Sequence, residues 1–337
     1  MKKWLSITVV SVLILGFLVS TEKIATSAPI ELKVVSYATK GYPSLAGLDY
    51  YGDLVRERSG GRLQIKWAGG PEVFSPGDLL EKCGQGIVDL VHCPLGYWAR
   101  RAPELGYDGL PWNVNWEGLP QLVQATWIPA DKVLNKQGVK LLCPSNYTVV
   151  MHFFTKKPVH KMEDLKGRVI RGYGLMPAKM IESLGGSSVV LPTAELYTAL
   201  ERGTVDGAIY NWMSFMDYKL YETGVRYVVD DPLIYGFACG VGMNMDRYQK
   251  LSPELQKVLL DTGREAAIWS IRYWKEENER CKNEGQAKGV KLYTLPPDEA
   301  KRWRTKLVGD LTPIFLGLKG ADPQILRDFI KLMEKKW

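Results

Sequence analysis

Residues 79–89 read LLEKCGQGIVD, and residues 196–206 read LYTALERGTVD. Each stretch begins with apolar residues at helical spacing and continues with a glycine that can end a helix, Gly86 or Gly203. Each closes on a Val-Asp pair at the start of a further apolar run. The recurrence of this unit predicts two similar α/β lobes, one in each half of the chain.

Strand and helix patterns alternate on both sides of the two copies. The first half shows strand patterns at 31–37, 62–67 and 87–92 and helix patterns at 43–58 and 76–85. The second half shows strand patterns at 168–171, 188–191 and 205–210 and helix patterns at 176–184 and 194–202. Such alternation is typical of largely parallel sheets, which bind ligands beyond the carboxyl ends of their strands. The loops after His92 and Ile209 are therefore candidate site loops.

A long helix is predicted from Pro253 to about Gln286. Ser252-Pro253-Glu254 is a typical helix start, with a cap, a proline at the first helical position and an acid in the first turn. At 1.5 Å per residue such a helix is about 50 Å long, which exceeds one lobe, so we expect it to cross both. Its apolar residues recur at intervals of three and four and would face the lobes. They are Leu255, Val258, Leu259, Ala266, Trp269 and Tyr273.

The N-terminus has the layout of a secretory signal peptide. Lys2 and Lys3 precede an apolar stretch from Trp4 to Val19, and small residues stand at the −3 and −1 positions before Ala28. We expect residues 1–27 to be removed between Ser27 and Ala28, which leaves an exported, periplasmic protein. The apolar stretch is short for a membrane span of about 20 residues, although an uncleaved anchor is the alternative.

Composition limits the class of protein further. The chain has 337 residues, of which 46% are hydrophobic and 24% charged, values that exclude a disordered chain and a polytopic membrane protein. Removal of residues 1–27 takes away three lysines and one glutamate, so the formal charge falls from +7 to +5. No run of five like charges occurs, and we expect no nucleic-acid partner.

The sequence contains no recognisable catalytic constellation. It has three histidines and lacks HExxH, GxSxG and Walker-type glycine motifs. The five cysteines form no CxxC pair, so we expect buried thiols, with one disulfide as the alternative. We expect no enzyme activity, no cofactor and no metal site.

Several motifs in a fixed order resemble the DctP-like family, the periplasmic substrate-binding proteins of TRAP transporters. The densest are EDLKGRVIR at 163–171, LGG at 184–186, LP at 191–192, ELYTAL at 195–200 and GTVDG at 203–207. Supporting motifs are RSGGR at 58–62, GIVD at 86–89, Asn244 and LSPELQ at 251–256.

The resemblance implies a two-lobed α/β fold with hinge strands and a long helix across both lobes. We expect lobe I at 28–149 plus 236–277 and lobe II at 150–235 plus 278–337. It also implies a monomeric receptor that closes on a small organic acid and delivers it to the TRAP membrane permease subunits. A protein of the same fold that feeds a membrane sensor is one alternative, and a secreted enzyme is another.

The resemblance identifies Arg171 as the family's ligand-binding arginine. A guanidinium is permanently charged, and its planar fork matches a carboxylate with two parallel hydrogen bonds. Two departures stand out. Tyr210 takes the place of the family's ligand-binding asparagine, with Asn211 one residue late, and the apolar Val150 and Met151 occupy the region of a second arginine.

One charged anchor with many aromatic rings suggests an acid that has an apolar or aromatic body. We expect about half of the nearby rings to line the cleft and the others to be packing. These rings are Tyr97, Trp98, Tyr173, Tyr210, Trp212 and Phe237. Glu72 either accepts a hydrogen bond from a ligand hydroxyl or amine or is simply solvated.

Overall fold

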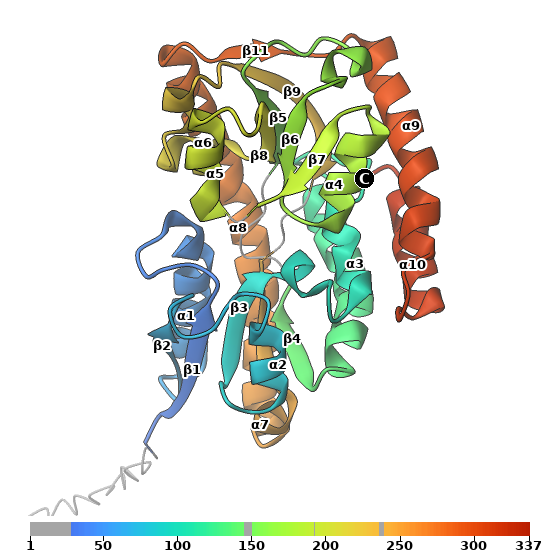
Figure 1. Cartoon of the computed structure of the whole chain (residues 1–337). Coiled ribbons are helices and arrows are strands. Elements are labelled where there is room, and N and C mark those ends of the chain that lie inside the picture. The colour runs from blue at the N-terminus through green and yellow to red at the C-terminus, as the bar shows by residue number, and fades with distance from the viewer. Residues whose placement is uncertain (1–27, 145–149, 192, 236–238) are drawn as a thin grey trace, which may run out of the picture.

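Two separate β-sheets, each flanked by helices, form the frame of the protein (Figure 1). The computed structural model describes residues 28–144, 150–191, 193–235 and 239–337, so the expected signal peptide lies outside the described residues. The first sheet has the strand order β2-β1-β3-β10-β4, and the second has β11-β9-β5-β8-β6-β7. This arrangement confirms the predicted two-lobed α/β class.

The first sheet is mixed rather than fully parallel. β1 runs parallel to β2 and β3, whereas β10 runs antiparallel to β3 and β4. Its strands are β1 (Ile30–Ser36), β2 (Leu63–Gly69), β3 (Leu90–Pro94), β4 (Val139–Cys143) and β10 (Cys239–Asn244). Its helices are η1 (Pro43–Leu45), α1 (Ala46–Arg58), α2 (Leu79–Gly84), η2 (Leu95–Trp98), η3 (Pro103–Gly109), α3 (Leu119–Asn135) and α7 (Met245–Gln249).

The second sheet is built in the same way. β6 is parallel to β7 and β8, and β5 is antiparallel to β8 and β9. Its strands are β5 (Val150–Thr155), β6 (Val169–Gly172), β7 (Ser187–Val190), β8 (Gly207–Tyr210), β9 (Tyr227–Tyr235) and β11 (Lys291–Tyr293). Its helices are η4 (Met162–Leu165), α4 (Leu175–Ser183), α5 (Thr193–Glu201), α6 (Trp212–Asp217), η5 (Leu220–Thr223) and α9 (Pro297–Leu316). The last helix, α10 (Pro323–Met333), packs on α9 and on α3 of the first lobe.

The antiparallel strands are those that arrive from the other sheet. β5 follows β4 of the first sheet, and β10 follows β9 of the second. A strand that enters a sheet from the side of the other lobe runs opposite to strands whose carboxyl ends point there. Each sheet thus has one antiparallel strand and is otherwise parallel, which agrees with the largely parallel sheets that the sequence predicts. The two crossings themselves leave no local mark in the strand pattern.

The repeated Val-Asp pair performs the same task in both lobes. Asp89 Oδ2 accepts a hydrogen bond from the Lys33 amide at 2.9 Å, and Asp206 Oδ2 accepts one from the Val169 amide at 2.8 Å. Each aspartate thus fixes the start of its own strand to the neighbouring parallel strand. The turn glycine before it adopts a positive φ of 73° at Gly86 and 74° at Gly203, a conformation that favours glycine.

Replacement of either aspartate by alanine is expected to lower the free energy of unfolding by about 1.5–3 kcal/mol, because a charge-assisted hydrogen bond is lost. Asp206→Asn keeps an acceptor oxygen and is expected to retain most of the stability. Urea unfolding of Asp89→Ala, Asp206→Ala and Asp206→Asn measures the difference. Equal stability of the alanine and asparagine variants would contradict a stabilising role for these aspartate hydrogen bonds.

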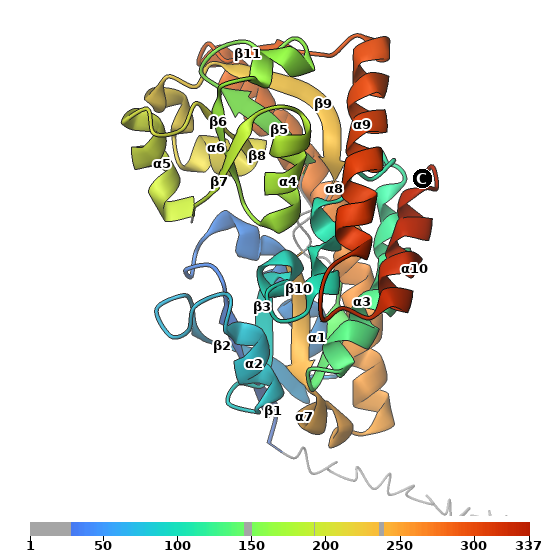
Figure 2. The same ribbon diagram turned by 45° about the vertical axis from the view of Figure 1, so that its right-hand side comes forward.

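The long helix α8 (Pro253–Ala287) spans both lobes, as predicted (Figures 1 and 2). Ser252 caps it by accepting a hydrogen bond from the Leu255 amide, and it packs on α1 and β4 of the first lobe and on α6 of the second. Of the expected inner face, Leu255, Leu259 and Ala266 are buried. The other three residues of that face, Val258, Trp269 and Tyr273, are only half-buried. The rings of Trp269 and Tyr273 stack on each other at 4.8 Å. Within the described part of the chain, no helix has the length and apolar character that crossing a membrane requires.

The C-terminal helices contact both lobes. α9 packs on α4, whereas α10 lies against α3 beside the first sheet (Figure 2). An ion pair of 2.7 Å joins Lys136 to Asp322, and the Asp322 amide donates to Glu104 at 2.7 Å. The expected lobe boundaries remain a prediction. They place residues 278–337 in lobe II, and α10 is the part of that range that lies at the first lobe.

All five cysteines lie in the described ranges, and each is buried and forms no disulfide. Burial raises the pKa of Cys83, Cys93 and Cys239 far above the ordinary value for a thiol, so these three stay protonated. The buried cysteines act as small apolar side chains, as the sequence predicted.

His152 lies where β5, β9 and α8 meet. The ring is 4% exposed, its Nδ1 is 3.7 Å from Asp230 Oδ1, and Lys282 of α8 pairs with the same aspartate. Burial lowers the pKa of His152 to about 4, although the Asp230 charge opposes this. The imidazole is therefore neutral at physiological pH.

The buried neutral His152 predicts acid sensitivity. The unfolded chain takes up the proton near the ordinary histidine pKa of about 6.5, before the folded chain does, so its contribution to stability is lost as the pH falls towards 4. His152→Phe is expected to flatten the decline in unfolding free energy between pH 6.5 and pH 4. Urea unfolding at several pH values tests this, and equal slopes for both proteins would contradict it.

Candidate ligand-binding site

The candidate site lies at the carboxyl ends of the parallel strands of both sheets. In the first lobe, Tyr37 follows β1 and Tyr97 lies in η2, directly after β3. In the second lobe, Arg171 and Tyr173 lie at the end of β6, and Tyr210 is the last residue of β8. This is the position that α/β sheets use for ligands, and here both sheets contribute to it.

Arg171 is a buried cation at the centre of this group. Its side chain is 2% exposed, its Nε donates to the Leu191 carbonyl at 3.0 Å, and its Nη2 lies 3.5 Å from Thr193 Oγ1. The guanidinium carbon is 5.5 Å from the centre of the Tyr210 ring, within cation–π distance. No aspartate or glutamate of the described residues forms an ion pair with Arg171. A buried charge without an opposite charge is costly, so the site favours an anion.

Three tyrosines lie near enough to the guanidinium for its charge to affect their pKa values. Burial raises the pKa of Tyr97 to about 12, and the nearby Arg171 charge partly opposes that rise. The same two effects act on Tyr173 and Tyr210, whose pKa values also lie above the ordinary range, and the Tyr210 hydroxyl also bonds with Thr193. The hydroxyls are therefore neutral, and each can donate a hydrogen bond to an anion held by Arg171.

One aromatic contact joins the two lobes near this site. The ring of Tyr42 in the first lobe lies 5.9 Å from that of Tyr218 in the second. Tyr218 in turn is close enough to Tyr210 to raise the pKa of that group. Within the first lobe, Tyr37 and Tyr97 meet edge to face at 6.4 Å.

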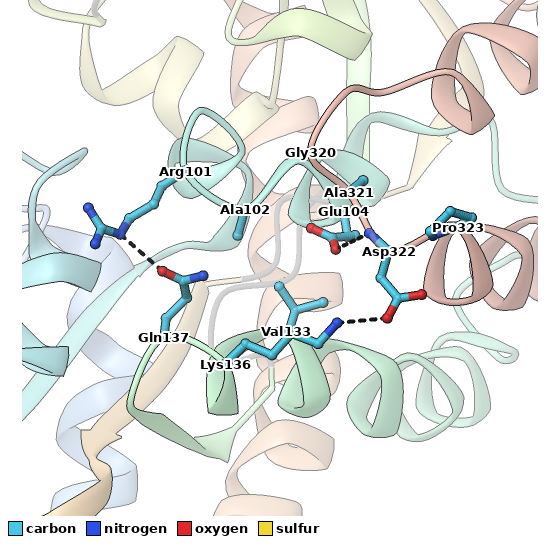
Figure 3. A pocket seen from close by; sticks show the side chains of 10 residues that line it. All are labelled: Arg101, Ala102, Glu104, Val133, Lys136, Gln137, Gly320, Ala321, Asp322 and Pro323. Carbon is cyan, nitrogen blue, oxygen red and sulfur yellow. Dashed lines mark hydrogen bonds and ion pairs between the residues drawn. The ribbon is translucent and has the colours of Figure 1, made fainter.

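A surface pocket elsewhere is less suited to a ligand (Figure 3). It lies between η3, the end of α3 and the loop before α10, and its polar groups bond with one another. Arg101 donates to Gln137 at 3.0 Å and to Glu81 at 2.8 Å, and Lys136 pairs with Asp322. Its charges are already paired, whereas Arg171 lacks a carboxylate. The described residues contain no group of three or more His, Cys, Asp or Glu side chains placed to share a metal ion.

Comparison with models of known protein families identifies the family of this chain. The model of the DctP family, described as bacterial extracellular solute-binding protein family 7, matches residues 34–315. The chain belongs to the DctP family. A solute-binding protein of Albidiferax ferrireducens is 24% identical over 266 residues, which are 74% of this chain and 75% of that protein.

Solved structures of TRAP-type solute receptors share the fold. DctP7 of Bordetella pertussis, an extracytoplasmic solute receptor that binds pyroglutamic acid, has a TM-score of 0.78 and 21% identity, and the match covers 90% of this chain and 99% of that one. A TRAP periplasmic solute-binding protein of Desulfovibrio salexigens with bound orotic acid has a TM-score of 0.76 and 20% identity, with 90% and 99% covered. These likenesses confirm the two-lobed fold of this DctP-family protein.

Of the site residues expected from the sequence, the structure brings Arg171, Tyr97, Tyr173 and Tyr210 together. Three others have packing or capping roles. Trp98 is 1% exposed and donates to the Pro76 carbonyl at 3.0 Å, within the first lobe. Asn211 caps α6 by accepting from the Ser214 amide at 2.8 Å. The Trp212 ring packs on Phe154 at 5.0 Å.

Glu72 and Phe237 are the remaining residues that the sequence placed at the site. Glu72 is exposed, and its Oε1 accepts a hydrogen bond from the Gly70 amide at 2.6 Å, a contact that lowers its pKa. In this structure the Glu72 carboxylate stabilises its own loop through this hydrogen bond. Phe237 lies outside the described residues. A ligand role for each of these residues stays a prediction.

The sequence reasoning missed four residues around the site: Tyr37, Tyr42, Thr193 and Tyr218. Tyr37 and Tyr42 follow the first strand, so the rule that pointed to the loops after His92 and Ile209 could have found them. Thr193 is the first residue of α5, and its hydroxyl lies 3.5 Å from Arg171 Nη2. Tyr218 follows α6 and has no comparable signal in the sequence.

Proposed function

We propose that this TRAP-type solute receptor captures a small organic carboxylate between its lobes and delivers it to a TRAP membrane permease. The buried Arg171 without a carboxylate partner carries the proposal. In a site with little water, its guanidinium forms two parallel, charge-assisted hydrogen bonds with a carboxylate, which fixes the direction of the ligand. The acids bound by the Bordetella pertussis and Desulfovibrio salexigens receptors support this class of ligand.

The part of the ligand beyond its carboxylate would contact aromatic side chains. Tyr97 belongs to the first lobe, and Tyr173 and Tyr210 belong to the second, so a ligand on Arg171 would have rings on both sides. Rings with a single hydroxyl pack on apolar surface and still donate one hydrogen bond. Together with the apolar Val150 and Met151, both buried, this favours an acid with an apolar or aromatic body.

Export to the periplasm is part of the proposal. It rests on the layout of residues 1–27 and on the extracytoplasmic character of the family. The full chain, expressed in a Gram-negative host, should yield a periplasmic product that begins at Ala28. Intact-mass measurement of that product checks both the cleavage and the compartment.

A thermal-shift screen tests the binding function. Carboxylates are compared with their primary amides, which keep the shape of the ligand and lose its charge. A ligand at one hundred times its Kd stabilises the folded state by about 2.7 kcal/mol, enough to raise the Tm by several degrees. We expect at least one acid to raise the Tm while its amide does not. If no acid raises the Tm, or if amides act equally well, the proposed function fails.

A further inference from the structure

The Leu191 carbonyl and the Thr193 hydroxyl hold the Arg171 side chain in place. Arg171 pairs with Val189 of β7 on one side and with Ala208 of β8 on the other, so its strand lies between these two. Leu191 lies two residues beyond Val189, between the end of β7 and the start of α5. This segment and the first residue of α5 thus supply both acceptors that the described residues offer to the buried guanidinium.

These two contacts use only part of the Arg171 guanidinium. Nε–H and one Nη2–H point along one edge of its plane, whereas Nη1 and Nη2 together form the outer end of the fork. Nε donates to the Leu191 carbonyl at 3.0 Å, so the first edge is occupied. Nη2 lies 3.5 Å from Thr193 Oγ1 but carries a second hydrogen, and no described residue accepts a hydrogen bond from Nη1. The outer end is therefore where two donors remain for a ligand.

Tyr210 holds the guanidinium from another side. It lies two residues beyond Ala208, so it follows the partner of Arg171 on β8 just as Leu191 follows the partner on β7. The guanidinium carbon is 5.5 Å from the centre of the Tyr210 ring, within cation–π distance. Contacts at the ends of β7 and β8 thus fix the plane of the fork before a solute arrives, which lowers the ordering cost of binding.

We propose that Leu191 and Thr193 orient Arg171 so that the solute carboxylate binds end-on, with one oxygen on Nη1 and the other on Nη2. Thr193 is a positioning residue in this arrangement, because it acts on the solute through Arg171. The inference rests on the proposed function, since it assumes that the solute is a carboxylate that binds Arg171. It also means that Arg171 holds a single carboxylate, because the protein itself occupies the edge that contains Nε.

Nuclear magnetic resonance of isotope-labelled arginine side chains distinguishes end-on from side-on binding in the wild-type protein. The Arg171 signals are those that are missing from the spectrum of Arg171→Lys. Acetate, benzoate and phenylacetate are the probes, and acetamide, benzamide and phenylacetamide are their uncharged controls. We expect at least one acid, but not its amide, to shift the Nη signals of Arg171 more than its Nε–H signal, because Nε–H stays bonded to Leu191. A side-on carboxylate would replace Leu191 at Nε–H and shift that signal most.

Variants of Thr193 test the positioning role by calorimetry with the acid that binds best of the three. Thr193→Val keeps the shape of the side chain and loses the hydroxyl, whereas Thr193→Ser keeps the hydroxyl. We expect Thr193→Val to weaken binding about three- to tenfold, the effect of one lost hydrogen bond, and Thr193→Ser to stay within about twofold of the wild type. Thr198→Val, on the exposed face of α5, is the matched control and should leave the Kd unchanged.

The outcomes separate this inference from the proposed function. A shift that is largest at Nε–H, or equal binding by Thr193→Val and the wild type, overturns the inference and leaves the proposed function standing. If none of the three acids shifts the Arg171 signals, the inference is overturned too, and the thermal-shift screen decides the proposed function separately. If Arg171→Lys does not fold, the Thr193 variants decide, since rescue by serine but not by valine supports the inference. If Thr193→Val does not fold, the wild-type spectra decide.

Discussion

Replacement of Arg171 by alanine is expected to weaken binding of the carboxylate ligand at least about thirtyfold. Truncation of one partner of a buried, hydrogen-bonded charge pair costs about 2–5 kcal/mol, and each 1.4 kcal/mol is a factor of about ten in Kd. Tyr97, Tyr173 and Tyr210 remain in the variant, but neutral hydroxyls cannot replace the guanidinium charge. Calorimetry with the tightest acid from the thermal-shift screen measures the change.

Two controls separate the charge of Arg171 from its geometry. Arg171→Lys keeps a positive charge but loses the planar fork, so we expect it to lie between the wild type and the alanine variant. Arg56→Ala removes an exposed arginine of α1 and should leave the Kd unchanged. Because Arg171 Nε also bonds with the Leu191 carbonyl, the Tm of each unliganded variant must be measured as well. Wild-type affinity in a folded Arg171→Ala protein would contradict the prediction.

Gly263→Ala is expected to cost about 3 kcal/mol of unfolding free energy, the largest loss predicted here for one methyl group. Gly263 is buried in α8 where the helix meets the first sheet, and an added Cβ would lie 1.9 Å from the Leu142 carbonyl oxygen. A backbone carbonyl cannot move aside as a flexible side chain can. The methyl group would therefore push α8 away from β4, and urea unfolding measures the cost.

Gly309→Ala is the matched control for this prediction. Gly309 is also a helical glycine, in α9, but it is exposed and an added Cβ would meet nothing within 4 Å. Alanine there should stabilise the protein by about 0.5–1 kcal/mol, because glycine is the poorer helix former. The same substitution thus has opposite expected signs at the two positions. A loss at Gly309 as large as that at Gly263 would show that close approach of α8 to β4 is not the cause.

The fold was largely predictable because its two decisive features are local in the sequence. The repeated helix-glycine-Val-Asp unit marks a parallel strand in each lobe, and Ser252-Pro253 marks the start of α8. The antiparallel strands β5 and β10 were not predictable, since their direction depends on crossings between lobes. The start of β3 at Leu90 rather than at Ile87 is a smaller difference, and it leaves Ile87 exposed.

The site was predictable in part. Arg171 follows from the family motif, and Tyr97 and Tyr210 follow from their place at strand ends. Trp98 and Trp212 are also aromatic and also lie just after a strand, yet they pack into the lobes. The direction in which such a side chain points depends on contacts with residues distant in sequence.

A crystal structure of the mature protein with its bound solute would show whether Arg171 holds the solute carboxylate between the lobes. The solute is retained from the host or is the tightest acid of the screen, and mass spectrometry of the dissolved protein confirms which one is present. We predict that one carboxylate of the solute makes two hydrogen bonds with the Arg171 guanidinium, with Tyr97, Tyr173 and Tyr210 around it. A bound solute that leaves Arg171 without an anion, or that lies outside the space between the lobes, would contradict it.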